Sequence, residues 1–271
     1  MVVVPLVRDF FLRLNKAHKK NIDLNKKYQK EPDREVAKKL SSVCCRIKEN
    51  VDYNLTLDGT EFVVFDTETT GLKPLEGDEI TSIAGVIVKD GEIIKDKSFS
   101  KLVNPVKQIP KKVEKLTGIT NEMVEDKEPI GPVLCEFLEF INTRPLVAHF
   151  ASFDLTFLNL KLNWFCQEEI YNPVIDTFQL GQLLYPGLPS HGLDYLLEFF
   201  GIPTKGRHSA EGDAFMTANI LTKFFEKLKR HEVTTLQEIR EIIHHKDSKH
   251  YREKFLSKMD KMNGMGEFPY C

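Results

Sequence analysis

The sequence predicts an α/β domain built on a mixed sheet, with a helical region before it and a helical tail after it. The dipeptide Asp90-Gly91 joins two apolar runs, which is a strong signal for a β-hairpin. Beyond it strand and helix patterns alternate, which favours a sheet covered by helices. At both ends of the chain, apolar residues recur at helical spacing. We therefore divide the chain into residues 1–58, 59–230 and 231–271.

The N-terminal region contains two helical patterns. One runs from Val3 to Ala17, and the other runs from Val36 to Ile47, with Asp33 placed to cap it. Each pattern has one apolar face. These faces must be buried either on the main domain or on a partner, and we slightly favour the main domain.

The middle region alternates strands and helices. Strands are predicted at 62–68, 80–88, 92–103, 146–150 and 174–175, and helices at 132–141, 154–162, 193–200 and 210–228. The tail has two further helical patterns, at 236–243 and 251–262. An antiparallel hairpin followed by alternating helices and strands predicts a sheet with both parallel and antiparallel neighbours.

Charge is distributed unevenly along the chain. Residues 1–50 hold 13 Lys/Arg and 6 Asp/Glu, a net charge of +7, and residues 222–271 hold 11 and 8, a net charge of +3. Residues 51–221 hold 14 and 26, a net charge of −12. Basic flanks suit a polyanion and an acidic centre suits cations. Lysine-rich helices whose outer faces are simply exposed to solvent would explain the basic flanks equally well.

Composition favours a reducing, cytoplasmic location without a membrane segment. No run approaches the roughly 20 apolar residues that a membrane helix needs. The apolar start of the chain is short and lacks a basic n-region, so a signal peptide is not expected. The five cysteines form no CxxC pair and no zinc-type cluster. We expect free thiols.

The stretch EFVVFDTETTGL, from Glu61 to Leu72, ends an apolar strand in two acids. Asp66 and Glu68 are two residues apart, so on a strand they point to the same side. Carboxylates this close repel each other unless one holds a proton or a cation lies between them. A strand-ending turn would explain Asp66 alone, but it explains the whole DTETTG run poorly.

Two more acids follow at the ends of other elements. Asp154 comes just after a short apolar strand, at the start of a helix, where an Asp is usually an N-cap. Asp213 lies early in the long helix among small residues, as if that face packed against the sheet. A carboxylate on a buried face needs a compensating partner.

Three segments carry a resemblance to a known family. FDTETTGL, VAHFASFD and HSAEGDA, in that order, resemble the motifs of the DnaQ-like 3′–5′ exonucleases of the DEDD superfamily, in its histidine-containing branch. The segments LVNP and LTGIT resemble those of the proofreading epsilon-type subunit of bacterial DNA polymerase III. The resemblance covers roughly residues 60–228. It implies a ribonuclease H-like fold with a five-stranded mixed sheet flanked by helices.

The resemblance also implies a catalytic set and two bound Mg²⁺ or Mn²⁺ ions. The implied metal ligands are Asp66, Glu68, Asp154 and Asp213, and His208 is the implied general base. Two ions about 3.5–4 Å apart activate a water and relieve charge on the phosphate, and such hard cations prefer oxygen ligands. An imidazole titrates near neutral pH, which suits a base. Residues 208 and 213 would point about 140° apart on one helix, so we expect the histidine in the loop before it.

The implied substrate-binding residues are Thr69, Thr70, Leu72, His149, Phe150 and Phe153. The family usually has Asn where this chain has Phe150. Its ring could stack on a base of any sequence, or it could fill the core at the strand end, which we slightly favour. Two tempting residues have simpler interpretations: Asp176 as a helix cap and His191 as structural.

The leading hypothesis is therefore a metal-dependent 3′–5′ exonuclease. It would hydrolyse phosphodiester bonds from single-stranded 3′ ends, releasing nucleoside 5′-monophosphates, in DNA proofreading or repair. A DNA polymerase subunit is a candidate partner, and no oligomeric state is predicted. One alternative is an RNA 3′-end trimming enzyme. Another is a non-catalytic scaffold that binds nucleic acid or a polymerase, which the loss of an acid or of the histidine would have favoured.

Overall fold

The computed structural model describes residues 31–244, which surround a five-stranded mixed sheet. The strands are β1 (Glu61–Thr69), β2 (Ile80–Lys89), β3 (Glu92–Leu102), β4 (Leu146–Ala148) and β5 (Val174–Asp176), in the order β3-β2-β1-β4-β5. The pairs β1–β2 and β2–β3 are antiparallel, whereas the pairs β1–β4 and β4–β5 are parallel. The predicted mixed sheet of five strands is confirmed.

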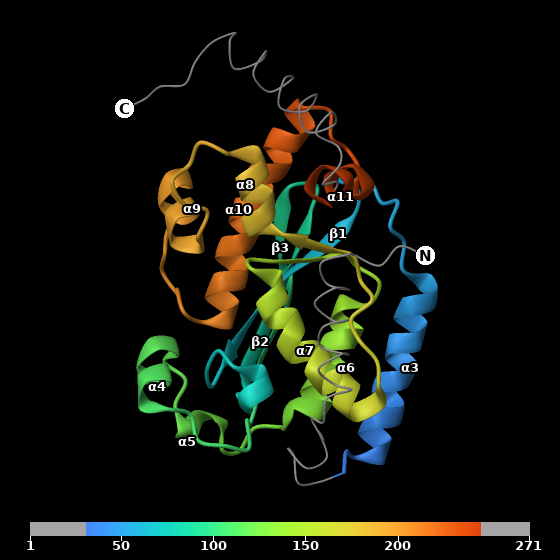
Figure 1. Ribbon diagram of the computed structural model, residues 1–271, viewed down its shortest axis with the longest axis vertical. Helices are drawn as coiled ribbons and strands as arrows, with labels where there is room; N and C mark the ends of the chain where they lie inside the picture. Colours follow the sequence, from blue (N-terminus) through green and yellow to red (C-terminus); the bar gives the residue numbers. More distant parts are fainter. Residues whose placement is uncertain (1–30, 245–271) are drawn as a thin grey trace.

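Helices cover both faces of this sheet (Figure 1). One face carries α8 (Thr177–Leu184), α9 (Leu193–Phe200), α10 (Ala210–Arg230) and α11 (Leu236–His244). The other face carries α3 (Arg34–Asn50), α6 (Ile130–Ile141) and α7 (Ala151–Cys166). The short elements η1 (Pro74–Glu76), α4 (Lys111–Thr117) and α5 (Asn121–Val124) lie beyond one end of the sheet. None of the helices in the described range is long and apolar enough to cross a bilayer.

The two apolar clusters divide the side chains of β1 between the two faces. Phe62 and Val64 belong to the cluster under α10, and Val63 and Phe65 belong to the cluster under α6 and α7. This split follows from the period of two along a strand. Because β1 is the middle strand and both its faces are covered, it reads as a nearly continuous apolar run rather than as an alternating one.

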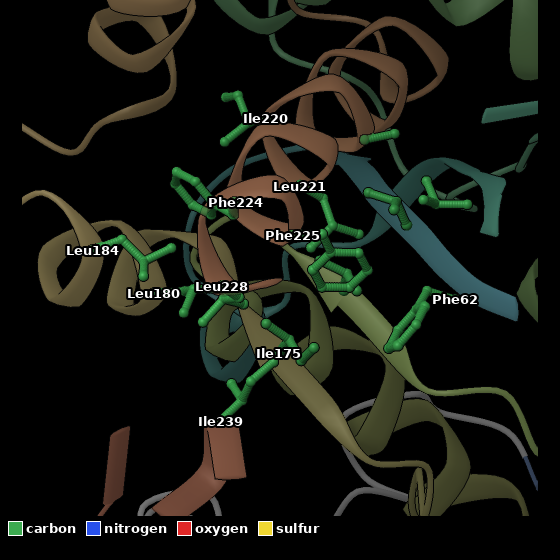
Figure 2. Close-up of a cluster of buried hydrophobic side chains, with 14 of the residues drawn as sticks. Phe62, Ile175, Leu180, Leu184, Ile220, Leu221, Phe224, Phe225, Leu228 and Ile239 are labelled. Atoms are coloured by element: carbon green, nitrogen blue, oxygen red, sulfur yellow. The ribbon is translucent and has the colours of Figure 1, made fainter. Parts of the chain in front are cut away.

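Helix α10 is fixed on the sheet by its large apolar side chains. Figure 2 shows Phe225 and Leu228 of α10 directed toward Phe62 of β1 and Ile175 of β5. The rings of Phe62 and Phe225 meet edge to face, with centroids 4.9 Å apart, an arrangement that aromatic pairs prefer. This packing sets the position of the first turn of α10 relative to the end of β1.

Helix α3 packs on the main domain, as the sequence analysis favoured. Its buried apolar stripe lies against α6 and α7 and consists of Leu40, Val43, Cys44 and Ile47. The predicted cap is confirmed, because the Asp33 carboxylate accepts hydrogen bonds from the backbone N–H groups of Glu35 and Val36. The helical patterns predicted at 3–17 and 251–262 lie outside the described residues.

Replacing Leu40 by Ala is expected to lower the free energy of unfolding by about 2–5 kcal/mol, the usual cost of truncating a large apolar side chain in a core. Leu40 is fully buried between α3 and the main domain. Urea denaturation measures the change, with Lys39→Ala on the exposed side of the same helix as the control. Equal stability of the two variants would contradict the packing of α3 described here.

The predicted boundaries between β4 and α7 differ from the structure. The strand ends at Ala148 instead of residue 150, and the helix begins at Ala151 instead of residue 154. The cause is Phe150, whose φ of 58° places it in the left-handed region, where non-glycine residues are uncommon. Its side chain makes no capping hydrogen bond, so no cap residue marked the start of this helix in the sequence.

Candidate active site

Three of the predicted acids meet where β1 ends and α10 begins. Asp66 and Glu68 continue the row of β1 side chains that faces α10, and Asp213 lies in the first turn of that helix. One carboxylate oxygen from each lies within 4.8 Å of the others. Within residues 31–244 this is the single group of three or more potential metal ligands.

Asp154 reaches the same part of β1 from the opposite face. It lies in the first turn of α7, is 2% exposed, and does not cap the helix. Its Oδ1 accepts hydrogen bonds from the backbone N–H of Thr67 at 3.0 Å and from the Thr67 hydroxyl at 2.6 Å. Thr67 lies between Asp66 and Glu68 on the strand, so this contact fixes Asp154 next to both. Asp154 is not part of the 4.8 Å group.

Burial raises the pKa values of all four carboxyl groups, and repulsion from the other acids adds to this effect at Asp66 and Glu68. Burial raises the pKa of Asp66 well above its ordinary value, and the charges of Asp154, Asp213 and Glu68 add to the effect. The same causes, burial first, raise the pKa of Glu68 to about 7. Burial raises the pKa of Asp154 to about 7 and that of Asp213 above its usual range. At neutral pH the group therefore favours protons or bound cations.

This predicts a pH dependence for the metal-free protein. Because the pKa values are raised on folding, the native state binds more protons than the unfolded state, and these acids make stability fall as pH rises from about 4 to about 7. Buried His149 acts oppositely, since its pKa is lowered to about 4. In EDTA, Glu68→Gln should therefore lose less melting temperature between pH 5 and pH 8 than the parent protein. An equal loss in both would contradict the raised pKa of Glu68.

The four residues Asp66, Glu68, Asp154 and Asp213 are called the acidic group below. Arg207 contacts this group from the loop before α10. Its Nη1 donates to Asp213 Oδ2 at 2.5 Å, and its Nε donates to Asp194 Oδ1, on α9, at 2.6 Å. The other oxygen of Asp213, Oδ1, is buried without a hydrogen-bond partner among the residues described. The sequence analysis did not assign a role to Arg207; its position directly before His208 was the available signal.

His208 lies in the loop before α10, where the sequence analysis expected it. Its φ is 64°, in the left-handed region. The helix starts two residues later, at Ala210, and Ser209 caps it by accepting a hydrogen bond from Gly212 N–H at 3.2 Å. Burial raises the pKa of Asp213, and the nearby backbone of His208 acts in the opposite direction. The histidine is thus adjacent to the acidic group and outside regular structure.

The loop after β1 is held by its own hydroxyl groups. Thr69 Oγ1 donates to Gly71 O at 2.7 Å, and Thr70 Oγ1 donates to Asp78 Oδ1 at 3.1 Å. A Cβ at position 71 would come within 2.4 Å of the Asp78 carboxylate, so this close approach requires glycine. At the tip of the loop, Leu72 is 80% exposed. Asp78 had no signal in the sequence pattern.

The predicted aromatic residues gather at the start of α7. Phe150 is 45% exposed and stacks on Phe178, with ring centroids 4.1 Å apart. The interpretation of Phe150 as core filling is therefore wrong. His149 Nδ1 lies 2.9 Å from the Thr177 hydroxyl, and its ring meets the Phe150 ring edge to face. Phe153 is partly buried and packs against the cluster under α7.

The two structural interpretations are confirmed. Asp176 caps α8 by accepting a hydrogen bond from Phe178 N–H at 2.9 Å. His191 Nε2 lies 2.9 Å from the carbonyl oxygen of Tyr185. Neither residue belongs to the acidic group. The cysteines at 44, 45, 135 and 166 are free thiols, as expected.

The acidic group fits hard divalent cations. It offers only carboxylate oxygens, the ligands that Mg²⁺ and Mn²⁺ prefer. A buried oxygen without a hydrogen bond, Asp213 Oδ1, is costly unless something pairs with it. Bound cations would stabilise these buried carboxylates and relieve the repulsion that contributes to the raised pKa values of Asp66 and Glu68.

Comparison with known proteins identifies the family. The model of the RNase_T family, described as exonuclease, matches residues 63–221, more than half of the chain. The chain belongs to this exonuclease family. The matched region contains all five residues that the resemblance implied as catalytic. The DnaQ-like resemblance and the identification as an exonuclease are confirmed.

Named relatives agree with this identification. The chain is 42% identical over 172 residues to the DNA polymerase III subunit epsilon of Aquifex aeolicus, covering 64% of this chain and 83% of that protein. It is also 42% identical over 182 residues to a PolC-type DNA polymerase III of Clostridium perfringens, covering 66% of this chain. The matched region is only 12% of the PolC-type protein.

A solved structure supports the fold. Exonuclease X, solved in complex with 5′ overhanging duplex DNA, is 28% identical with a TM-score of 0.50, covering 61% of this chain and 91% of that one. The predicted ribonuclease H-like fold class is confirmed by this likeness together with the strand order of the sheet.

Proposed function

We propose that this chain is a metal-dependent 3′–5′ exonuclease that shortens single-stranded DNA ends during proofreading or repair. The observation that carries the proposal is the meeting of Asp66, Glu68 and Asp213, with Asp154 fixed beside them. DNA is favoured over RNA because the relatives named above are DNA polymerase III proteins. Products are nucleoside 5′-monophosphates.

In this proposal the chain's own residues divide the work. Asp66, Glu68, Asp154 and Asp213 hold two Mg²⁺ or Mn²⁺ ions, which supply Lewis acidity at the phosphate and lower the pKa of a water. A ring nitrogen of His208 accepts the proton of the attacking water. The position of His208 in a loop lets it approach once a strand is bound.

Substrate binding is assigned to the rim of the acidic group. Leu72, exposed at the loop tip, provides an apolar surface for the terminal base, with Thr69 and Thr70 shaping the loop beneath it. The exposed ring of Phe150 stacks on a base, supported from behind by Phe178. The partly buried residues His149 and Phe153 position that ring.

Replacing Phe150 by Ala is expected to raise KM for single-stranded DNA by about 5- to 150-fold with little change in kcat, because base stacking on an aromatic ring contributes about 1–3 kcal/mol. Phe150→Tyr keeps the aromatic face and should keep binding. Phe199→Ala removes an equally exposed ring from α9 and is the control. Unchanged KM in Phe150→Ala would remove this residue from the substrate site.

We also propose that different segments of the chain have different roles. Residues 59–230 carry the chemistry. Helices α3 and α11 outside this range support it, because their apolar faces are buried in the same two clusters as the sheet. A DNA polymerase subunit is the proposed partner, on the strength of the relatives' names alone.

Digestion of 5′-labelled strands tests the proposed function. Single-stranded DNA, a duplex with a mispaired 3′ end, and single-stranded RNA are incubated with Mg²⁺ or with EDTA. We expect stepwise shortening from the 3′ end, only with metal, and faster on DNA. Faster shortening of RNA would favour the trimming enzyme. No shortening of any strand with either metal would favour a binding scaffold.

A further inference from the structure

Arg207 is a cationic residue that forms an ion pair with the acidic group. In the described part of the chain it is the one Lys or Arg side chain with an ion pair to any of the four proposed metal ligands. The pair is well shielded, since the Asp213 side chain is 8% exposed and that of Arg207 is 20% exposed. A shielded ion pair is screened little by salt.

The guanidinium is held at two ends. Nη1 binds Asp213 on α10, and Nε binds Asp194 on α9, whose own side chain is 74% exposed. The planar guanidinium places several donors in fixed directions, so one arginine can bridge two carboxylates. Asp194 therefore anchors the charge of Arg207 over the acidic group.

The two oxygens of Asp213 have different surroundings. Oδ2 accepts from Arg207, whereas Oδ1 is buried and has no hydrogen bond within residues 31–244. Oδ2 therefore pairs with the guanidinium of Arg207, and Oδ1 is available to a metal ion. The electrostatic effect extends further: against the larger effect of burial, Arg207 lowers the pKa of Asp66, Glu68 and Asp213.

We propose that Arg207 is a built-in counter-cation and positioning residue of this site. It stabilises the carboxylates of Asp66, Glu68 and Asp213 while the metal ions are absent. It also orients Asp213 through Oδ2 and sets a limit on metal affinity, because its positive charge opposes that of the ions. This inference rests on the proposed metal site. It concerns a residue that holds no metal itself.

Loss of the Arg207 charge is expected to increase the affinity of the site for Mn²⁺. A substitution that removes a contact at a metal site usually weakens metal binding. Replacing Arg207 by Gln should instead tighten Mn²⁺ binding by roughly tenfold, because a unit positive charge a few ångströms from the ions is lost. In EDTA at pH 8 the same variant should melt at a lower temperature, and saturating Mn²⁺ should raise its melting temperature by more than in the parent. A purely structural role for Arg207 would lower metal affinity instead.

The experiment compares four full-length proteins by calorimetric Mn²⁺ titration and by melting in EDTA and in Mn²⁺. Arg207→Lys keeps the charge and should restore near-parental affinity. Arg46→Gln makes the same change in an ion pair with Glu139 on the far α3–α6 surface, and should leave affinity unchanged. Affinity in Arg207→Gln that is equal to or weaker than in the parent overturns the inference. A parent protein that binds no Mn²⁺ overturns the proposed metal site as well.

A second measurement does not depend on the folding of Arg207→Gln. The Nε–H of Arg207 gives an NMR signal that its absence from the Arg207→Lys spectrum assigns. Mg²⁺ at saturation should shift this signal, because the ions compete for Asp213, while the signals of the other arginines stay in place. A signal that is unchanged at saturating Mg²⁺ contradicts the inference.

Discussion

Asp66→Asn is expected to reduce exonuclease activity by at least about 10³-fold while the fold is retained. Burial raises the pKa of Asp66, and the charges of Asp154, Asp213 and Glu68 raise it further. Losing one group that stabilises charge in a transition state typically costs about 10²–10³-fold, and the proposed metal site would be weakened as well. Single-turnover digestion of labelled single-stranded DNA measures the change.

The matched control for this variant is Asp176→Asn. Asp176 is also at the end of a strand and next to Phe150, but it caps α8 and lies outside the acidic group. It should lose some stability and keep most of its activity. Asp66→Asn with activity within about tenfold of the parent would remove Asp66 from the metal-binding set.

His208→Asn is expected to lower kcat by about 10²–10⁴-fold, the scale of a lost general base, while Mn²⁺ binding is retained. Asn is the appropriate replacement because the φ of 64° at this position is one that Asn tolerates better than most residues. Activity assays and Mn²⁺ titration on the same preparation separate the two effects. Loss of metal binding in parallel with activity would indicate a structural role.

The pH–rate profile provides a second readout for the histidine. In the parent, kcat should fall at acid pH, because a general base must be unprotonated to accept a proton. In His208→Asn the residual rate should lose that dependence. An identical profile in both proteins would assign the pH dependence to the metal-binding acids.

The sequence specified the sheet well, because strand signals in this chain are strong. The Asp90-Gly91 turn and the apolar run of β1 each have a local cause that a pattern can detect. The start of α7 was missed for the opposite reason. A left-handed Phe150 without a capping side chain carries no local signal for the start of the helix.

The sequence analysis found the acids because they lie in recognisable motifs. It did not find the residues that hold them in place. Thr67 fixes Asp154 across a sequence separation of 87 residues, and the Arg207 contact to Asp194 depends on how α9 packs beside α10. Neither pairing follows from spacing along the chain. Phe150 was misassigned to the core because an apolar residue at a strand end is buried more often than not, and only the fold turns its ring outward.

A crystal structure of the protein soaked with Mn²⁺ tests the central claim most directly. Anomalous difference density then locates each bound ion without reference to any assumed ligand. We expect peaks within coordination distance of Asp66, Glu68 and Asp213, with Asp154 in contact with at least one ion. Well-ordered carboxylates with no anomalous density between them, at a Mn²⁺ concentration that supports digestion, would contradict the account.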